Sequence, residues 1–569
     1  MGGNKASVVC HTEYTMSSQL FYLVGDDPST ARAVVIDEKW KAEDLKRAVG
    51  LVFHVAQPLG ITFHAADGNT LTTIADAASN DGPVGLRIDG QPVQEPQGPA
   101  GLPLVGSFYE IFPDHLGNHY RLFRKYGHVI KTTNMGKTTY LTDDPDVALV
   151  ALAESAYFTK KINENHPLWG IKDNTSIFIG DTETENFRQA HKFLPPAMGP
   201  KAVRHYTPLM QECARESFTV FDELDARGEA WNVYQYMIKL ASQTVGKFSL
   251  GMDFGHFASP DVPLHSLVTN IVSLLSLNKK VTARGEWYKN VPFGDPARLR
   301  AVQKIVYGQL QDAVDAAPTS GIRDLPLNEA AIKASCVADY LTHAVDEKGE
   351  RFPPKLILGN MLVVTGAGYT TTSALMSWLV YCVVTYPGTQ SRLLQELIDH
   401  DVTSDTVWTP ELAHGLPYLD NFVKETQRLH NASFQPGRTA KTDVVLPGGY
   451  RIPADAVIIP ALYAIQTNPA HWRDPFRFDP ARWDTDEVKN DRHRGAYMPF
   501  ATGARGCIGF NFALLEVKIL LAELLFRYEF AREGLEAIEY DPEFQLIRPL
   551  NLYVRAKRRG EYPAKSVSV

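Results

Sequence analysis

The sequence predicts a mainly α-helical protein with minor β structure, preceded by a small α+β domain. Short runs of β-branched and apolar residues alternate with one amphipathic stretch over residues 18–90. A segment rich in proline and glycine follows over residues 91–103. Residues 104–560 are mostly helical in pattern, and strands are expected there only near 129–142 and 442–461.

Composition limits the number of domains and the class of partner. A chain of 569 residues is too long for one ordinary domain. Its formal net charge of -8 argues against nucleic acid as a partner, because binding phosphates needs a basic excess. The cysteines stand singly, without a CxxC pair, which favours a reducing compartment. They are Cys10, Cys213, Cys336, Cys382 and Cys507.

The N-terminus, MGGNKASVVCHTEY, lacks the apolar core of a secretory signal. We therefore expect a soluble, cytoplasmic protein without an N-terminal transmembrane anchor, and leave peripheral membrane contact open. The charge-free stretch between Lys355 and Arg392 is long enough to cross a bilayer. Its centre, TGAGYTTTS, is rich in glycine and hydroxyl groups, which favours a helix buried on all sides over a transmembrane span.

The small N-terminal domain combines strands with one helix. Strands are expected at 20–25, 32–38 and 84–90, with a helix at 41–56 and a strand and turn from residue 60. This order resembles the ubiquitin-like β-grasp fold. The resemblance implies an unknown protein partner for this module, and a packed appendage without a partner is the alternative.

We expect an N-terminal tail (1–17), the small module (18–90), a Pro/Gly linker (91–103), the larger domain (104–560) and a C-terminal tail (561–569). Because proline and glycine favour an extended spacer, few contacts are expected to cross the linker. A chain that begins near Gln97 is therefore expected to fold without the module.

The segment FATGARGCIGFNFALLE (500–516) is the most informative part of the chain. Cys507 precedes an apolar helix, where the helix dipole would lower the pKa of its thiol. Glycines let the backbone turn so that amide groups point at the sulfur. Gly509 leaves room for a flat macrocycle, and Arg505 offers a cationic fork to an acidic group.

This segment resembles the cytochrome P450 signature Phe-x-x-Gly-x-Arg-x-Cys-x-Gly and matches it at every specified position. The resemblance implies the cytochrome P450 fold over residues 104–560, with Cys507 as the thiolate ligand of heme b (iron protoporphyrin IX). Such a ligand favours cleavage of the O–O bond. The implied cofactor-binding residues of the loop are Phe500, Gly503, Arg505 and Gly509. A buried structural cysteine is the alternative, and the ten-residue pattern disfavours it.

Glu425 and Arg428 lie three residues apart in KETQRLH and can pair on one face of a helix. Alone, such a pair is an ordinary surface feature. The resemblance implies that they form a buried network with a second arginine downstream, and Arg482 in FRFDPARW fits this role. The family often has glutamate where Ala481 stands.

The stretch AGYTTT (367–372) resembles the oxygen-binding part of the family's long central helix. Ala367 and Gly368 would leave room for dioxygen, and Thr371 falls on the position of the threonine that hydrogen-bonds the bound oxygen. Thr370 stands where the family has an acid that relays protons, which puts the ordinary relay in doubt. The alternative is that these hydroxyls only bond to the helix backbone.

Two weaker matches concern the heme propionates. FRQAH (187–191) resembles the helix at the heme edge, which implies that Phe187 and His191 lie by a propionate. An isolated histidine on a helix is otherwise a surface residue. Arg438 falls where the family often has another propionate-binding arginine.

The order of motifs is most similar to that of the soluble fatty-acid-hydroxylating members. This similarity implies that Phe178 overhangs the heme, and that Lys137 and Tyr140 stand at the channel mouth to hold a substrate carboxylate. The implied pocket-lining residues are Ser433, Phe434 and Gln435. A lysine and a tyrosine on a β-hairpin are otherwise surface residues.

We therefore expect a heme-thiolate monooxygenase that inserts oxygen from O2 into an apolar small molecule, a fatty acid or a secondary-metabolite type of compound. Its electrons would come from NADPH through a separate diflavin reductase, because only 62 residues follow Cys507. One alternative is a heme-thiolate isomerase or peroxygenase that needs no reductase. Another is a non-catalytic heme-binding sensor.

Overall fold

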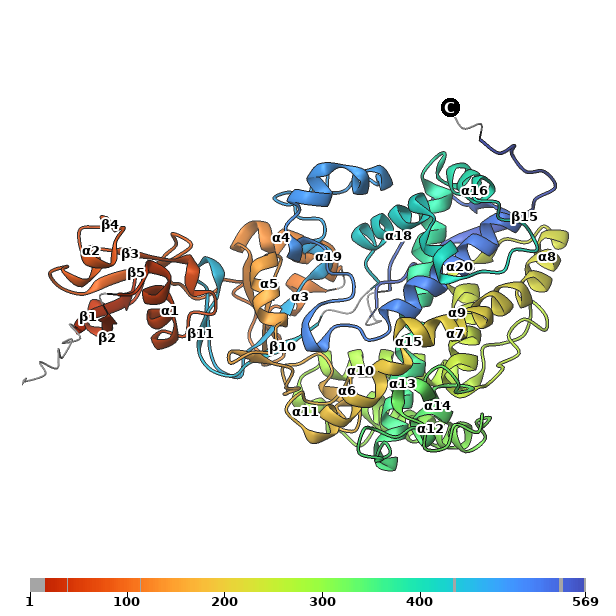
Figure 1. Ribbon diagram of the computed structural model, residues 1–569, viewed down its shortest axis with the longest axis horizontal. Coiled ribbons are helices and arrows are strands. Elements are labelled where there is room, and N and C mark those ends of the chain that lie inside the picture. Colours follow the sequence, from red (N-terminus) through yellow and green to blue (C-terminus); the bar gives the residue numbers. More distant parts are fainter. Residues whose placement is uncertain (1–15, 38, 113, 433–435, 542–545, 567–569) are drawn as a thin grey trace, which may run out of the picture. The chain divides into compact units, whose positions relative to one another are not determined.

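The computed structural model describes residues 16–37, 39–112, 114–432, 436–541 and 546–566 (Figure 1). The chain forms two compact units. Unit 1 comprises residues 1–97, 155–158 and 440–456, and unit 2 comprises 98–154, 159–439 and 457–569.

Unit 1 is a five-stranded sheet with short helices. Its strands are β1 Met16–Leu23, β2 Arg32–Asp37, β3 Ile61–His64, β4 Thr70–Leu71 and β5 Val84–Ile88, and its helices are α1 Ala42–Val52 and α2 Ile74–Ala78. The strand order is β2-β1-β5-β3-β4, with β1 parallel to β5 and the other pairs antiparallel. The predicted small α+β domain is confirmed. Kinship of this domain to ubiquitin stays a prediction.

Alternation along the strands gives unit 1 its core. Phe21 and Leu23 of β1 face inward, whereas Leu20, the residue before Phe21, is 44% exposed. Leu45 and Val49 lie one turn apart on α1 and are fully buried.

A distant segment completes unit 1. The short strands β11 Val444–Val445 and β12 Arg451–Ile452 pair with each other, and Val445 packs into the core of the N-terminal sheet. The first residues of the predicted linker are also not a free spacer, because they bond to other parts of unit 1. Val93 is buried and donates its N–H to Val24 O, and Gln94 N–H donates to Gly449 O. The first half of the predicted linker is therefore part of unit 1.

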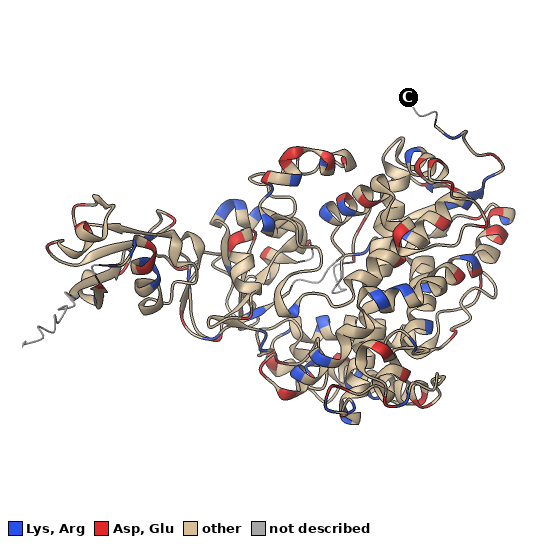
Figure 2. Ribbon diagram, in the orientation of Figure 1, with Lys and Arg blue, Asp and Glu red and all other residues tan. Residues whose placement is uncertain are grey.

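Unit 2 is mainly helical, and charged residues of both signs are interspersed along its helices (Figure 2). Its helices are α3 Phe108–Ile111, α4 His115–Tyr126, α5 Pro145–Leu152, α6 Glu185–Ala197, α7 Pro200–Glu216, α8 Phe218–Arg227, α9 Val233–Leu250, α10 Ser266–Ala283, α11 Glu286–Lys289, α12 Gly294–Asp315, α13 Leu327–Ala330, α14 Val337–His343, α15 Pro354–Thr385, α16 Thr389–Asp399, α17 Pro410–His414, α18 Pro417–Leu429, α19 Leu462–Ile465 and α20 Phe510–Arg527. The predicted fold class is confirmed.

The strands of this part of the chain are β6 Val129–Asn134, β7 Lys137–Thr142, β8 Phe158–Thr159, β9 Trp231–Asn232, β10 Arg438–Ala440, β13 Val457–Pro460, β14 Tyr528–Glu533 and β15 Tyr553–Arg558. One sheet contains β6, β7, β13 and β10 in this order. Strand β7 is antiparallel to β6 and parallel to β13. The expected strands near 129–142 correspond to β6 and β7, and β13 lies within the expected range 442–461.

The long helix α15 is the centre of the helical core. It has 32 residues, begins with Pro354 at its first position and is buried over most of its length. The prediction of a buried core helix is confirmed. Among the described residues, no helix is both long and apolar enough to cross a membrane.

Candidate active site

The loop before α20 positions Cys507. Gly503 adopts φ +76°, and a Cβ at this residue would lie 2.6 Å from Leu152 O, so the turn requires glycine. Cys507 N–H donates to Phe500 O at 3.0 Å. A Cβ added to Gly509 would stand 3.9 Å from Cys507 Sγ, so glycine keeps the space beside the sulfur clear.

The thiol of Cys507 has an exposed surface, yet the surrounding protein desolvates it. Both observations agree if the sulfur opens into a recess rather than onto the outer surface. Burial raises the pKa of the Cys507 thiol, and the backbone N–H of Gly509 opposes this shift. The helix start thus lowers this pKa as expected, but desolvation is the larger effect in the protein alone. A bound metal deprotonates a thiol directly.

Helix α15 has an open stripe within its buried length. Ala367 is exposed, and Gly368 and Thr371 are partly exposed, whereas Thr370 and Thr372 are buried. Residues 367, 368 and 371 share one face of the helix. This stripe of small side chains can accept a flat group.

The glycine in this stripe also has a packing role. A Cβ on Gly368 would lie 2.9 Å from Val245 Cγ1 on α9, so glycine lets the two helices approach closely. The expectation that Gly368 leaves room for dioxygen did not include this packing constraint. Ala367 is the more open of the two positions.

The threonine hydroxyls of α15 bond in different directions. Thr370 Oγ1 donates to Gly366 O at 2.7 Å, and Thr371 Oγ1 donates to Ala367 O at 2.8 Å. Backbone bonding, the alternative reading of this stretch, is therefore present for both. Thr372 Oγ1 instead donates to Glu516 Oε2 at 3.3 Å. Thr371 alone of the three has surface on the open face.

Buried cations gather near the loop of Cys507. Arg438 is 1% exposed and lies 3.4 Å from the Glu154 carboxylate. Arg505 Nη2 donates to Phe178 O and Gly180 O at 3.1 and 2.9 Å. Arg438 Nη2 and Arg505 Nη1 are buried without a hydrogen-bond partner among the described residues. These two guanidinium groups thus have donor capacity left for an anion.

Two further basic residues join this group. Lys160 Nζ donates to Phe178 O at 2.6 Å, and His166 Nε2 is buried without a partner in the described part of the chain. Burial, followed by the charge of Arg505 for Lys160 and of Lys160 for His166, lowers the pKa of both side chains strongly. These residues were missed, because Lys160 in FTKK and His166 in NENHP belong to no recognisable motif.

Burial also lowers the pKa of the two arginines, and at Arg505 repulsion adds to this effect. Burial and then the charge of Arg438 lower the pKa of Arg505 to about 9, and burial lowers that of Arg438 to about 10. An acidic group placed among them would offset the desolvation. The donors, the open stripe and the recessed sulfur together fit a flat macrocycle with acidic substituents.

His191 does not lie in this group. It is exposed on α6, and its ring lies 5.3 Å from that of Phe187. Phe187 instead lies under Arg505, whose guanidinium carbon is 4.2 Å from the ring centroid. Of the implied pair at the heme edge, Phe187 is buried and His191 is exposed.

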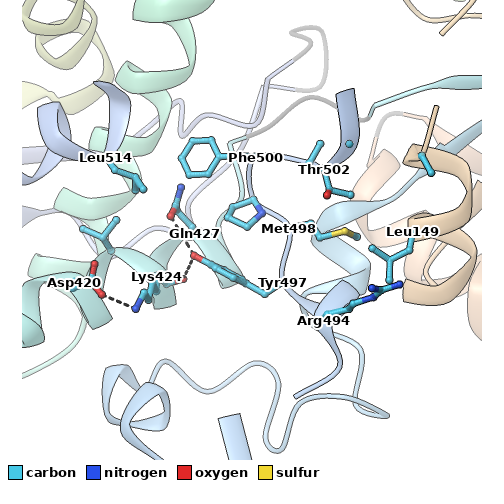
Figure 3. A pocket seen from close by; sticks show the side chains of 15 residues that line it. Leu149, Asp420, Lys424, Gln427, Arg494, Tyr497, Met498, Phe500, Thr502 and Leu514 are labelled. Carbon is cyan, nitrogen blue, oxygen red and sulfur yellow. Dashed lines mark hydrogen bonds and ion pairs between the residues drawn. The ribbon is translucent and has the colours of Figure 1, made fainter. Parts of the chain in front are cut away.

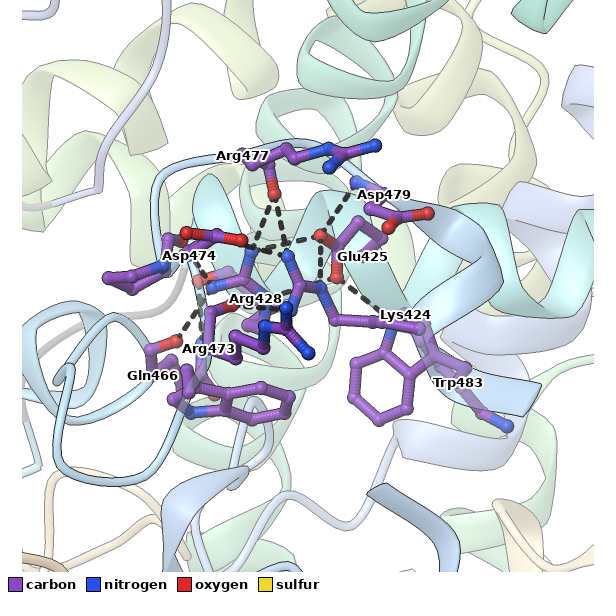
Figure 4. A network of polar contacts seen from close by, with 12 residues as sticks. Lys424, Glu425, Arg428, Gln466, Arg473, Asp474, Arg477, Asp479 and Trp483 are labelled. Atoms are coloured by element: carbon purple, nitrogen blue, oxygen red, sulfur yellow. Dashed lines mark hydrogen bonds and ion pairs between the residues drawn. The ribbon is translucent and has the colours of Figure 1, made fainter. Parts of the chain in front are cut away.

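Glu425, Arg428 and Arg482 meet in a buried network (Figure 4). The Glu425 carboxylate accepts two hydrogen bonds from Arg428 and one from Arg482 Nε, each at 2.9 Å. Trp483 Nε1 and Asp479 N–H also donate to it. The arginines reach backbone carbonyls as well, so α18 is joined to the segment 466–483.

A cavity of about 580 Å³ lies along residues 497–503 (Figure 3). Phe500 and Gly503 line it, together with Lys424 and Gln427 of α18. Neither Cys507 nor α15 lines this cavity. Cys507 therefore does not open into this cavity.

The residues implied for the channel mouth separate in the structure. Lys137 lines a smaller cavity with Thr139 and Leu141, whereas Tyr140 is 4% exposed and does not line it. The reason is alternation, since residues 137, 139 and 141 of β7 share one face. Lys137 and Tyr140 therefore lie on opposite faces of β7, and their joint action on a carboxylate stays a prediction. Phe178 is 37% exposed, and Ser433, Phe434 and Gln435 lie outside the described residues.

Glu516 is another residue that the motifs did not single out. It is fully buried on α20, and burial raises the pKa of its carboxyl to about 8. The available signal was a charged residue within an apolar helical run, LLEVKILLAELL. Its hydrogen bond with Thr372 joins α20 to α15.

Known proteins resemble this chain over most of its length. A family model described as Cytochrome P450 matches residues 96–554. The Cytochrome P450 monooxygenase alnD of Emericella nidulans is 47% identical over 557 residues, covering 97% of this chain and 100% of that protein.

Two further matches are more distant. The Bifunctional cytochrome P450/NADPH--P450 reductase ascE of Acremonium egyptiacum is 26% identical over 486 residues, which are 81% of this chain and 43% of that protein. Among solved structures, the cytochrome P450DA heme domain has a TM-score of 0.71 at 22% identity, covering 82% of this chain and 98% of that one. The last match concerns the fold alone.

Proposed function

Because this chain belongs to the cytochrome P450 family of heme monooxygenases, we propose that it inserts one oxygen atom of O2 into an apolar small molecule at the recess of Cys507. The observation that carries this proposal is the combination of a recessed cysteine, an open stripe on α15 and buried cations with unused donors. When bound, heme supplies the redox chemistry that activates dioxygen.

Each group of residues has a proposed part in holding the heme. Cys507 Sγ would bind the heme iron, and Gly509 keeps the adjacent space clear. Arg438, Arg505 and Lys160 hold the propionates, with the unused guanidinium donors as the main support. Phe500, Gly503 and the Glu425 network shape the loop and its surroundings, whereas His191 is not assigned to the propionates.

Thr371 is the proposed hydrogen-bonding residue on the oxygen side. Its hydroxyl now donates to Ala367 O, and a χ1 change would turn it toward the open face. Thr370 is buried and bonded to Gly366 O, so it is a poor candidate for ordering water there.

The proposed substrate is a fatty acid or a secondary-metabolite type of compound, and the proposed electron source is NADPH through a separate diflavin reductase. The name of ascE joins a P450 to an NADPH–P450 reductase in one protein, and the present chain corresponds to its P450-sized share. We place the enzyme in the cytoplasm, since the four cysteines in the described part of the chain are unpaired thiols.

The ligand assignment is tested with Cys507→Ser. The reduced wild-type protein under carbon monoxide should show the strongly red-shifted Soret band of a thiolate-bound heme, and Cys507→Ser should lose it. Cys213→Ser is the matched control, because Cys213 is a buried thiol with a raised pKa on α7. If Cys507→Ser keeps the band, another residue is the ligand.

A second candidate function is a heme-thiolate isomerase or peroxygenase, favoured by the absence of an acid at Thr370. Thr371→Ala separates the two functions. For a monooxygenase, this change should keep heme and substrate affinity but divert NADPH-derived electrons to hydrogen peroxide. Unchanged coupling of product to NADPH, together with faster turnover on an organic hydroperoxide without reductase, would favour the second candidate.

A further inference from the structure

The outer strand of the N-terminal sheet has an open edge. Strand β2, with the sequence RAVVID, stands at one end of the strand order β2-β1-β5-β3-β4 (Figure 1). Among the described residues, β1 is the only strand that pairs with β2. The other side of β2 therefore presents a row of backbone N–H and C=O groups without a neighbouring strand. The Cytochrome P450 family model begins at residue 96, so this edge lies outside the part of the chain that carries the proposed function.

The edge also lacks the usual protection. Proteins keep edge strands from pairing with other chains by placing lysine, proline or a β-bulge in them. Strand β2 contains neither lysine nor proline, and its pairing with β1 runs without a bulge from Met16↔Asp37 to Phe21↔Arg32. Residues 33–36 are all apolar. An edge of this kind favours the addition of a further strand.

The solvent face of the sheet is apolar beside this edge. Val34 and Ile36 are buried in the core of unit 1, so Val35 between them points to the opposite face, where it is 51% exposed. Leu20 on β1 is 44% exposed. It is the diagonal neighbour of Val35, because its direct partner on β2 is Ala33. Two apolar side chains thus adjoin the open edge and are available to a strand placed there.

The charges of β2 favour one kind of added strand. The strand begins with Arg32 and ends with Asp37, and the residues between them carry no charge. An antiparallel strand fits best if it also has a base at its start and an acid at its end. Strand β2 of a second copy meets this requirement, whereas parallel pairing of two copies would place like charges side by side. The edge is therefore self-complementary, as a twofold symmetric dimer requires.

From these observations we propose that two copies of this chain associate through β2 and join their N-terminal sheets across a twofold axis. Residues that oppose each other in an antiparallel pair have side chains on the same face, so the axis passes through one residue of β2. The axis lies at Val35, where the exposed side chain meets its own symmetry mate and Leu20 of each copy packs diagonally against the pair. A single strand pair buries less than the roughly 1,600 Å² of a standard interface, so the expected dissociation constant is on the order of 10 µM.

Sedimentation equilibrium of the full-length protein with its heme bound tests this proposal. The wild type should change from monomer to dimer between about 1 and 100 µM. Val35→Lys places like charges opposite each other at the axis and should weaken the dimer roughly tenfold or more. The matched control is Leu59→Lys, because Leu59 is also 51% exposed in unit 1 but lies in the single turn Pro58–Gly60, outside the strands. It should dimerise like the wild type.

A charge exchange tests the antiparallel order. Arg32→Glu and Asp37→Lys should each dimerise more weakly alone, because each places like charges side by side across the contact. Mixed in equal amounts, the two variants should form a heterodimer about as readily as the wild type dimerises, since each altered charge then faces an opposite one. Arg32 also donates to Val52 O, so thermal unfolding at about 1 µM, where the monomer predominates, must show that unit 1 of each variant stays folded.

Three results would overturn the proposal. They are a wild type that stays monomeric over the whole range, equal dimerisation of Val35→Lys and the wild type, and equal weakening by Leu59→Lys. A mixture of the folded charge variants that does not recover dimerisation would overturn the antiparallel twofold arrangement. Should the wild type stay monomeric, an extended segment of a different protein would replace the second copy as the strand that fits this edge.

Discussion

The basic residues near Cys507 differ in how far burial and neighbouring charges lower their pKa values. Arg438 and Arg505 were expected from the family pattern, whereas Lys160 and His166 were added only by the fold. Each buried cation lowers the pKa of its neighbours, and the described carboxylate that faces Arg438 is Glu154. A site with this excess of buried positive charge is most stable with an anion bound.

Glu516 gives a pH dependence with a definite sign. Burial raises the pKa of its carboxyl from 4.5 to about 8, so the folded protein keeps a proton that the unfolded chain releases. Its contribution to stability is therefore complete below about pH 4.5 and is lost as the pH rises through about 8. At pH 9 we expect the free energy of unfolding of Glu516→Gln to exceed that of the wild type by on the order of 2–4 kcal/mol, as measured by urea denaturation.

The two proteins should differ least at pH 5, where the wild-type carboxyl also holds its proton. Glu529→Gln is the control, because the Glu529 side chain is 62% exposed on β14. An equal difference between wild type and Glu516→Gln at pH 5 and pH 9 would mean that the carboxyl does not titrate in this range.

At the scale of elements, the Glu425 network connects a helix to an irregular segment. Glu425→Gln would leave Arg428 and Arg482 buried with one charge fewer to pair with. Breaking a buried pair in this way costs about 3–5 kcal/mol. We expect Glu425→Gln to unfold and to lose heme at lower urea concentrations than the wild type. The Soret band measures the loss of heme.

The control for this variant is Glu411→Gln, which removes an ion pair between Glu411 and the exposed Arg204. Exposed pairs contribute little, so stability and heme retention should hardly change. Equal retention of heme by Glu425→Gln and the wild type would show that the network supports neither the loop nor the heme.

Two elements also show how local geometry limits an inference from family resemblance. Strand β7 turns Lys137 and Tyr140 to opposite faces, although they are only three residues apart. On helix α15 the same separation places residues 368 and 371 on one open face. Side chains alternate between the two faces of a strand, whereas side chains three residues apart share one face of a helix, and this difference explains both outcomes.

At the scale of the whole molecule, residues 440–456 are part of unit 1, although they lie far from residues 1–97 in the sequence. Val445 is 2% exposed in the core of the N-terminal sheet, and Arg451 pairs with Asp26 through bonds of 3.0 and 2.5 Å. The expectation that a chain from Gln97 folds unaided is therefore revised. Such a chain would expose Val445 and its apolar neighbours, and we expect a lower soluble yield and a lower Tm.

Point variants separate this effect from truncation itself. Val445→Asp places a charge in the core and should destabilise unit 1 by several kcal/mol. Val35→Asp, at a position that is 51% exposed in the same unit, should change little. Thermal unfolding and limited proteolysis measure both. Equal stability of the two variants would show that Val445 is dispensable to the core.

The sequence by itself determined the features that depend on neighbouring residues. The loop around Cys507, the buried helix α15 and the elements of the N-terminal sheet follow from local patterns of glycine, apolar spacing and strand alternation. The order of Glu425, Arg428 and Arg482 predicted a network, because helix spacing and family resemblance both concern positions along the chain.

Only the tertiary structure decided which distant residues share a site. Lys160 and His166 join Arg438 and Arg505 through folding, and no local pattern marks them. Residues 440–456 belong to unit 1 because Val445 packs with residues some 400 positions earlier. Local patterns reflect backbone geometry, whereas these groupings depend on long-range packing and on the charges that packing brings together.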